Sequence, residues 1–158
     1  MREILFRGKR IDNGEWVEGF FVAKADPLLG IMASFILTQE FDTNGTLRSN
    51  MDWYKVDPET VGRYTGLTDK NGKKIFEGDL LNGFQYPFYH SKSNEHNYYA
   101  EVIWFPGNCA FGFYTHKHPT AKVSGISAKN ADFIEDFDSD DWEIIGNIHD
   151  NPELLEEG

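Results

Sequence analysis

Histidine side chains are the first candidates for chemistry in this sequence. His116 and His118 are separated by one residue, a spacing that puts both imidazoles on one face of a strand, as in some metal sites. The sequence supplies no cysteine pair and no H-E-x-x-H motif to accompany them. We therefore expect solvent-facing polar histidines. A metal-dependent hydrolase that uses His116, His118 and nearby acids is kept as an alternative.

Aspartates near the C-terminus alternate in a way that resembles the start of a calcium-binding loop. Asp136, Asp138 and Asp140 stand at every second position. An EF-hand needs glycine where Asp141 stands and a bidentate glutamate where Asn147 stands. This segment is therefore predicted to be a solvated acidic loop.

The single cysteine, Cys109, follows Pro106-Gly107-Asn108. A catalytic thiol needs a neighbouring base and a lowered pKa, and the sequence does not place a base beside it. The chain also has no G-x-S-x-G motif and no glycine loop ending in Gly-Lys-Ser/Thr. We predict a half-buried turn cysteine, no catalytic residue and no cofactor.

The composition indicates a folded protein of one domain or two small modules. Of the 158 residues, 40% are hydrophobic and 15% aromatic, enough to fill a core. No apolar run approaches the roughly 20 residues that span a bilayer, and the N-terminus lacks the pattern of a signal peptide. We therefore expect no membrane partner. Because one cysteine cannot form an internal disulfide, we expect the protein to be located in the cytoplasm.

The net charge of −11 lies entirely at one end of the chain. Basic and acidic side chains balance up to Lys129, whereas residues 130–158 hold eleven acids and no lysine or arginine. A solvated surface is the simplest interpretation. Two others stay open: an acidic imitation of nucleic acid that inhibits a host nucleic-acid-binding protein, and self-association with the basic first ten residues of a neighbour. Direct nucleic-acid binding is not expected, because only those ten residues are basic.

Turn signals and short β-rich segments dominate the chain. Asn13-Gly14, Asn44-Gly45 and Asn71-Gly72 favour the positive φ angles of tight hairpins. Four further segments, rich in β-branched and aromatic residues, predict strands. These are residues 79–85, 99–105, 110–114 and 143–148. Strands at this spacing predict a small barrel or sandwich.

Other segments depart from this pattern. Residues 151–156 begin with Asn-Pro-Glu, which predicts one or two helical turns. Residues 127–137 carry apolar side chains at helical spacing and predict another turn. Residues 85–98 have little periodicity and predict a long loop.

Aromatic side chains are concentrated between Phe84 and Tyr114. Most should fill the core, and the surplus could form a contact patch, because tyrosine and tryptophan anchor interfaces. The predicted partner-binding residues are the aromatics of the long loop together with the acids that follow. They are Tyr86, Phe88, Tyr89, Tyr98, Asp132, Glu135, Asp136, Asp138, Asp140 and Asp141.

Four stretches stand out when they are taken together: residues 7–10 with 14–19, 56–67, 68–81 and 143–155. The third and fourth are long and specific, and together the four span nearly the whole chain. They resemble the YopX-like family of phage and prophage proteins. The resemblance implies a mainly β protein with an SH3-like barrel in its C-terminal part, and it brings no catalytic residue.

We accordingly predict an N-terminal β-hairpin module (1–60), an SH3-like small β-barrel with a long loop near 85–98 (61–149), and a short helical acidic tail (150–158). Within the motif Phe-Glu-Gly-Asp-Leu-Leu, Gly78 should adopt a conformation costly for other residues. Asp79 should bond nearby backbone N–H groups. This motif is interpreted as a barrel corner.

The predicted function is that of a phage-derived accessory protein in the host cytoplasm. It would act without catalysis, by binding an unknown protein partner, and a homo-oligomer stays open. The nucleic-acid mimic and the metal-dependent hydrolase are the alternatives.

Overall fold

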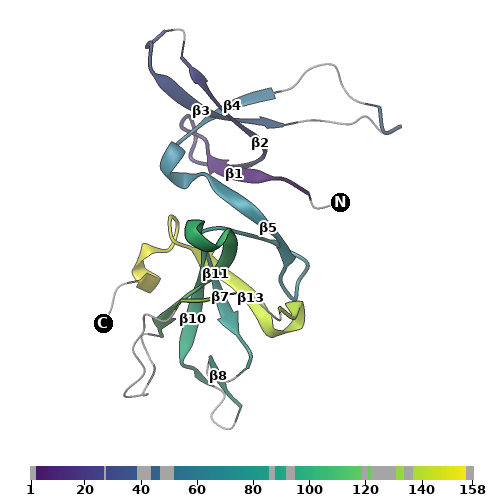
Figure 1. Cartoon of the computed structure of the whole chain (residues 1–158), viewed down its shortest axis with the longest axis vertical. Helices are drawn as coiled ribbons and strands as arrows, with labels where there is room; N and C mark the ends of the chain where they lie inside the picture. Colours follow the sequence, from purple (N-terminus) through teal and green to yellow (C-terminus); the bar gives the residue numbers. More distant parts are fainter. Residues whose placement is uncertain are drawn as a thin grey trace. The chain divides into compact units, whose positions relative to one another are not determined.

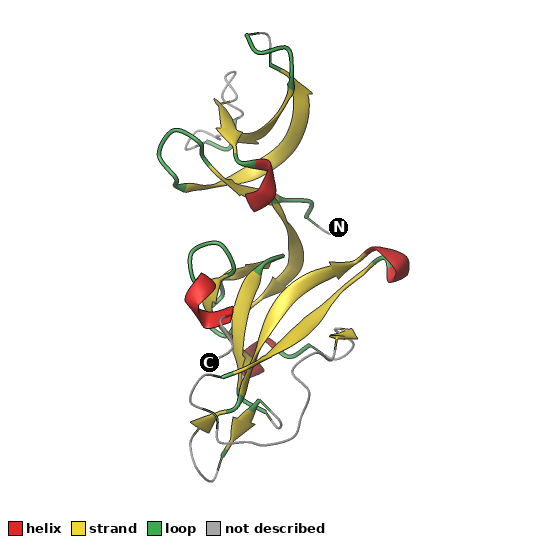
Figure 2. Ribbon diagram, turned by 90° about the vertical axis from the view of Figure 1, so that its left-hand side faces the viewer, coloured by secondary structure: helices red, strands yellow, loops and turns green. Residues whose placement is uncertain are grey.

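The computed structural model describes residues 3–26, 28–38, 44–46, 52–85, 88–91, 95–118, 121, 131–133 and 137–155. These residues form antiparallel strands joined by turns and four short 3₁₀ helices, as Figure 2 shows. The mainly β prediction is confirmed. No helix in this described part is long and apolar enough to span a membrane. The chain divides into two compact units, Met1–Tyr64 and Thr65–Gly158.

The N-terminal unit is an antiparallel sheet in which the strand order is β4-β3-β2-β1-β5 (Figure 1). Its strands are β1 (Phe6–Lys9), β2 (Trp16–Ala25), β3 (Met32–Thr38), β4 (Asp52–Val56) and the start of β5 (Gly62–Thr68). The Asn-Gly pair of residues 13 and 14 lies in the turn between β1 and β2, and that of residues 44 and 45 lies between β3 and β4. The glycine has positive φ in both pairs, so both predicted turns are confirmed.

This sheet curves until its two sides meet. A β-bridge joins Arg10 to Val56, and the Ile11 N–H donates to the carbonyl of Lys55 across the same seam. Ile36 and Val56 are fully buried inside the curve. Gly19 lets β2 lie close against β3, since a Cβ at this position would lie 2.1 Å from the carbonyl oxygen of Leu37.

The C-terminal unit is a second antiparallel sheet, with strand order β12-β11-β10-β7-β13 (Figure 1). Its strands are β7 (Asp79–Gly83), β10 (Tyr98–Phe105), β11 (Ala110–Lys117), β12 (Ala131–Phe133) and β13 (Trp142–Asn147). A further strand, β6 (Lys74–Phe76), pairs with β5. Seven buried side chains form the core: Ile75, Leu81, Ala100, Val102, Phe111, Phe113 and Trp142.

Local turn chemistry in this unit agrees with the sequence. Gly78 has φ +88°, and the carboxylate of the buried Asp79 accepts the Phe76 N–H at 2.8 Å. The Asn-Gly turn of residues 71 and 72 is also present. The four short 3₁₀ helices include η4 (Pro152–Leu155), the predicted C-terminal helical turn. The others are η1 (Pro58–Thr60), η2 (Pro106–Asn108) and η3 (Ser139–Asp141).

Two sequence predictions need correction. The helical turn expected in residues 127–137 is wrong for Ala131–Phe133, which form β12, because pairing with Gly112–Tyr114 of β11 outweighs a weak helical pattern. The long loop of residues 85–98 contains a two-stranded hairpin, β8 (Tyr89–His90) with β9 (Glu95–His96). The rest of residues 127–137 lies outside the described part, apart from Phe137.

Candidate functional site

Large apolar side chains are exposed only in the N-terminal unit, within the part of the chain that the structure describes. They are Ile4, Ile11, Phe20, Phe21, Leu28, Leu29, Ile31, Met32 and Trp53. Single exposed apolar residues are normal on soluble proteins, but a cluster of them marks a contact surface. Seven of the nine come from the β2–β3 hairpin or the strand beside it, β4, and all of these except Phe21 form the two groups described below.

The first group lies on one face of the β4-β3-β2 sheet, which we call the outer face. Trp53, Leu37 and Phe20 are directly opposed across the three strands, so their side chains project to the same side. Phe20 and Trp53 are 50% and 46% exposed. Phe35, on the same face, meets Trp53 edge-on with ring centroids 5.9 Å apart. The outer face therefore presents adjacent aromatic rings to solvent.

Lysine and arginine side chains lie over these rings. The ammonium of Lys24 is 4.3 Å from the centre of the Trp53 ring and 5.4 Å from that of Phe35. At the start of β2, the ring of Trp16 is covered by two cations of β1. The Arg7 guanidinium lies 4.6 Å from its centre and the Lys9 ammonium 5.6 Å. Cations in such positions are attracted by the negative faces of aromatic rings.

The strand register gives the outer face a positive charge. It places Arg7, Lys9, Lys24 and Lys55 on this side of the sheet, with Glu18 as the acid among them. The described strand residues of this face thus carry four cations and one acid.

The second group is the end of the β2–β3 hairpin, which we call the apolar tip: Leu28, Leu29, Ile31 and Met32. Leu28 is 92% exposed, and the other three are each at least 60% exposed. An apolar sequence was not expected at a chain reversal, where polar residues are usual.

Asp26 holds the apolar tip in place. One of its carboxylate oxygens accepts the N–H groups of Leu28 and Leu29 at 2.8 and 3.2 Å. The other accepts the Lys55 ammonium at 2.8 Å. The hydrogen bond from Lys55, followed by that from Leu28, keeps the pKa of Asp26 below its usual range. Since Lys55 belongs to the outer face, this ion pair ties the turn that carries the tip to strand β4.

The structure does not bring the sequence-predicted contact residues together. Tyr98 is 2% exposed and belongs to the interior, so it cannot contact a partner in this fold. Phe88 packs against Trp142 with ring centroids 5.0 Å apart. Tyr89 is half-buried against His96, at a centroid distance of 4.9 Å. Phe88 thus packs against the C-terminal sheet, and Tyr89 packs within the loop's own hairpin.

The predicted acidic residues are only partly described. Asp138 and Asp140 are exposed and Asp141 is half-buried in η3, where the carboxylate of Asp138 accepts the Asp140 N–H. Asp132 belongs to β12, opposite Phe113 of β11. Tyr86, Glu135 and Asp136 lie outside the described residues.

The histidines occupy the face of the C-terminal sheet opposite its core. Nε2 of His116 lies 2.7 Å from a carboxylate oxygen of Glu101, and both side chains are largely buried. The rings of His116 and His118 are 6.3 and 5.5 Å from that of Tyr99, so the two histidines share a face as predicted. They are not solvent-facing, which corrects that expectation. Among the described residues, no three His, Cys, Asp or Glu side chains are placed to hold a metal.

Burial also controls the ionisation of two histidines. Desolvation lowers the pKa of His118. It also lowers the pKa of His96, to which the nearby His118 adds a smaller lowering effect. Nδ1 of His96 and Oδ1 of Asn82 are buried without a hydrogen-bond partner. Cys109 is exposed in a left-handed turn, not half-buried as predicted, with its thiol 3.6 Å from the Pro106 carbonyl oxygen.

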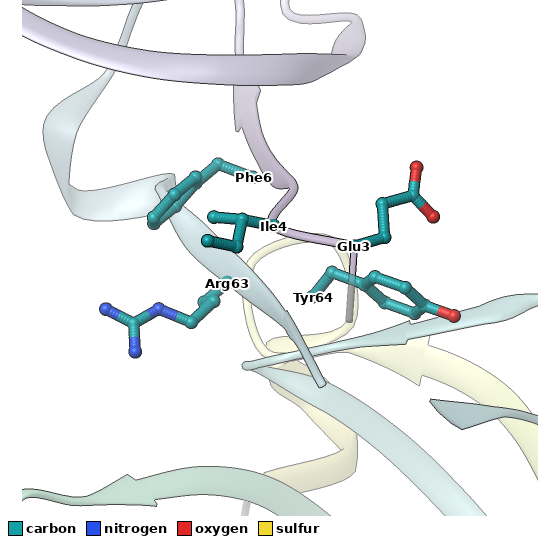
Figure 3. Close-up of a pocket in the computed structure, with 5 residues that line it drawn as sticks. All are labelled: Glu3, Ile4, Phe6, Arg63 and Tyr64. Carbon is teal, nitrogen blue, oxygen red and sulfur yellow. The ribbon is translucent and has the colours of Figure 1, made fainter. Parts of the chain in front are cut away.

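A pocket of about 350 Å³ lies in the N-terminal unit (Figure 3). Its lining residues are Glu3, Ile4, Phe6, Arg63 and Tyr64. The guanidinium of Arg63 points away from the carboxylate of Glu3 and the ring of Tyr64. The charged groups do not converge as a catalytic site requires.

Sequence reasoning missed the apolar tip, although a signal was present. Residues 26–32 read Asp-Pro-Leu-Leu-Gly-Ile-Met, in which turn formers surround and interrupt an apolar run. A turn that exposes apolar side chains indicates a contact surface.

The family comparison agrees with the sequence resemblance. A family model described as YopX protein matches residues 6–156. A crystal structure of protein EF1440 from Enterococcus faecalis aligns with 99% of this chain and 100% of its own, at 22% identity and a TM-score of 0.48. No curated protein matches the chain.

Proposed function

This chain belongs to the YopX family, and we propose that it is a non-catalytic protein-binding module. The contact surface consists of the outer face and the apolar tip of the N-terminal unit. The proposal extends to a phage or prophage origin and to action in the host cytoplasm, which the sequence resemblance and the single cysteine support.

One observation carries the proposal: among the described residues, the large exposed apolar side chains all lie in the N-terminal unit, and six of them belong to the outer face and the apolar tip. Burying an exposed leucine or isoleucine contributes about 1.5–3 kcal/mol, so a partner that covers the tip and the rings of Phe20 and Trp53 gains a substantial driving force. Because Asp26 already fixes the tip, little conformational entropy is lost on binding.

The test compares proteins recovered by tagged variants under crosslinking. Leu28→Ser combined with Ile31→Ser removes two exposed apolar groups from the tip, and its backbone hydrogen bonds to Asp26 remain. Ile4→Ser, an equally exposed position outside the surface, is the matched control.

We expect the wild type and the Ile4→Ser control to recover the same stoichiometric partner, and the double variant to lose it. Retention of that partner by the double variant contradicts the proposal. So does failure to recover any partner with a tag at either end.

A further inference from the structure

The charge of the contact surface says which kind of partner segment it fits. We propose that the outer face and apolar tip bind an acidic polypeptide segment in which carboxylates alternate with aliphatic or aromatic side chains. This rests on the proposed function, and it names the chemistry of the partner at that surface.

The first argument is charge complementarity. The outer face holds Arg7, Lys9, Lys24 and Lys55 against two acids, Glu18 and the Asp26 that pairs with Lys55. Residues 1–64 as a whole carry eight basic and ten acidic side chains. The positive charge is therefore local to this face. Local complementarity of this kind fixes the register of a bound segment and excludes basic partners.

The second argument is the position of Lys24. Its ammonium lies over Trp53 and Phe35, and its side chain is exposed, so a carboxylate can reach it from solvent. A partner residue next to that carboxylate then meets the rings. This pairing of a cation with a ring suits a segment in which acidic and apolar side chains alternate.

The third argument separates a peptide from a nucleic acid. Single-stranded nucleic acids bind on aromatic platforms that stack bases, along grooves of continuous positive charge. The outer face has exposed rings, but the apolar tip is aliphatic and offers a base no ring on which to stack. In addition, the N-terminal unit has a net charge of −2, which repels a long polyanion but not a short segment that meets only the face. A protein segment therefore fits the surface better.

The experiment measures the anisotropy of a fluorescein-labelled peptide added to the full chain. The probe is a ten-residue peptide that alternates Asp or Glu with Leu or Phe, and its control has Asn or Gln at every acidic position. We expect the acidic peptide to bind about tenfold more tightly than the amide peptide. Raising the salt from about 50 to about 300 mM should weaken that binding several-fold.

Charge reversal on the protein supplies the matched comparison. Lys24→Glu should weaken the acidic peptide about fivefold or more. Lys117→Glu makes the same change at an exposed position of β11 in the other unit and should leave binding within about twofold. If Lys24→Glu disturbs the fold, as judged by circular dichroism, Lys24→Gln takes its place.

Three results would overturn the inference: equal binding of the amide peptide, equal losses in the Lys24 and Lys117 variants, or tighter binding of an oligo-dT strand than of the acidic peptide. A different outcome separates this inference from the proposed function. If the wild type binds both peptides equally and the Leu28→Ser, Ile31→Ser variant binds neither, the proposed function stands and only the acidic chemistry of the partner is refuted. Failure to bind either peptide, when no partner is recovered from cells, removes both.

Discussion

Replacing Asp69 tests how the turn between β5 and β6 is held to β13. Asp69 is 2% exposed. One carboxylate oxygen accepts the N–H groups of Asn71 and Lys73, both at 2.9 Å, and the other accepts the Ile144 N–H at 3.0 Å. A single side chain thus satisfies three backbone donors from two separate segments.

The cost of substitution follows from those donors. Asp69→Ala leaves all three without their partner. The two turn donors can bond to water, whereas the Ile144 N–H is partly buried. At about 1 kcal/mol for each turn bond and about 1–3 kcal/mol for the donor on β13, the loss in unfolding free energy is about 3–5 kcal/mol. Asp69→Asn retains an oxygen for the turn but turns a donor toward Ile144, so its loss should be about 1–3 kcal/mol.

The pH dependence gives a second, independent check. Burial opposes the charge of Asp69 most strongly, but the three backbone donors outweigh it, and its pKa lies below the ordinary 3.8. A lowered carboxyl pKa contributes stability that is present above the unfolded value and is lost as pH falls through the folded value. Since asparagine does not titrate, the difference between wild type and Asp69→Asn should shrink below about pH 4.

Urea unfolding followed by tryptophan fluorescence measures both effects, in a Trp16→Phe, Trp53→Phe background that leaves only the C-terminal unit's tryptophans. Asp140→Asn, at an exposed position, is the control and should change stability by less than about 0.5 kcal/mol. A loss for Asp69→Ala no larger than that of the control refutes the reasoning. The reasoning is also refuted if the difference in unfolding free energy between wild type and Asp69→Asn is the same at low pH as at neutral pH.

Three further predictions concern other features of the fold. Because burial lowers the pKa values of His96 and His118, the unfolded chain binds more protons than the folded chain as pH falls below 6.5. Thermal stability should therefore drop between about pH 7 and 5.5, and His118→Gln should flatten that drop; an unchanged slope contradicts this origin. Gly78→Ala should cost about 1–2 kcal/mol in urea unfolding through its φ of +88°, whereas Gly78→Asn, which tolerates this region, should cost less; equal losses argue against backbone strain. Gly19→Ala places a Cβ 2.1 Å from a carbonyl oxygen of β3, so circular dichroism and proteolysis should show loss of the N-terminal unit with the C-terminal unit retained; an intact N-terminal unit would show that the strands can separate at that point.

Features specified by a few neighbouring residues could be predicted from the sequence. The Asn-Gly turns and the corner at Gly78 and Asp79 are local, because a glycine at positive φ and a carboxylate accepting nearby N–H groups suffice to form them. The short helical turn at Pro152–Leu155 is local in the same sense. Such features do not depend on which strands pair.

Features decided by strand pairing could not be predicted. The short strand at Ala131–Phe133 depends on its partner in β11, and weak helical spacing could not reveal that contact. The burial of Tyr98 depends on the order of strands in the second sheet. The sequence identified a surplus of aromatics but not the face that each would occupy. The contact residues predicted from it lie in the C-terminal unit, whereas the exposed apolar side chains of the described residues lie in the N-terminal unit.

The apolar tip is difficult to explain as a requirement of folding alone. A chain reversal between β2 and β3 needs the Asp26 carboxylate and a glycine, and polar residues would serve at the other positions. Leu28 at 92% exposure adds nothing to the interior and raises the tendency to aggregate. Soluble proteins offset such a liability with net charge, and this chain carries −11. The excess lies in residues 130–158, and the proposed acidic partner would instead meet the basic side chains of the outer face in the first unit.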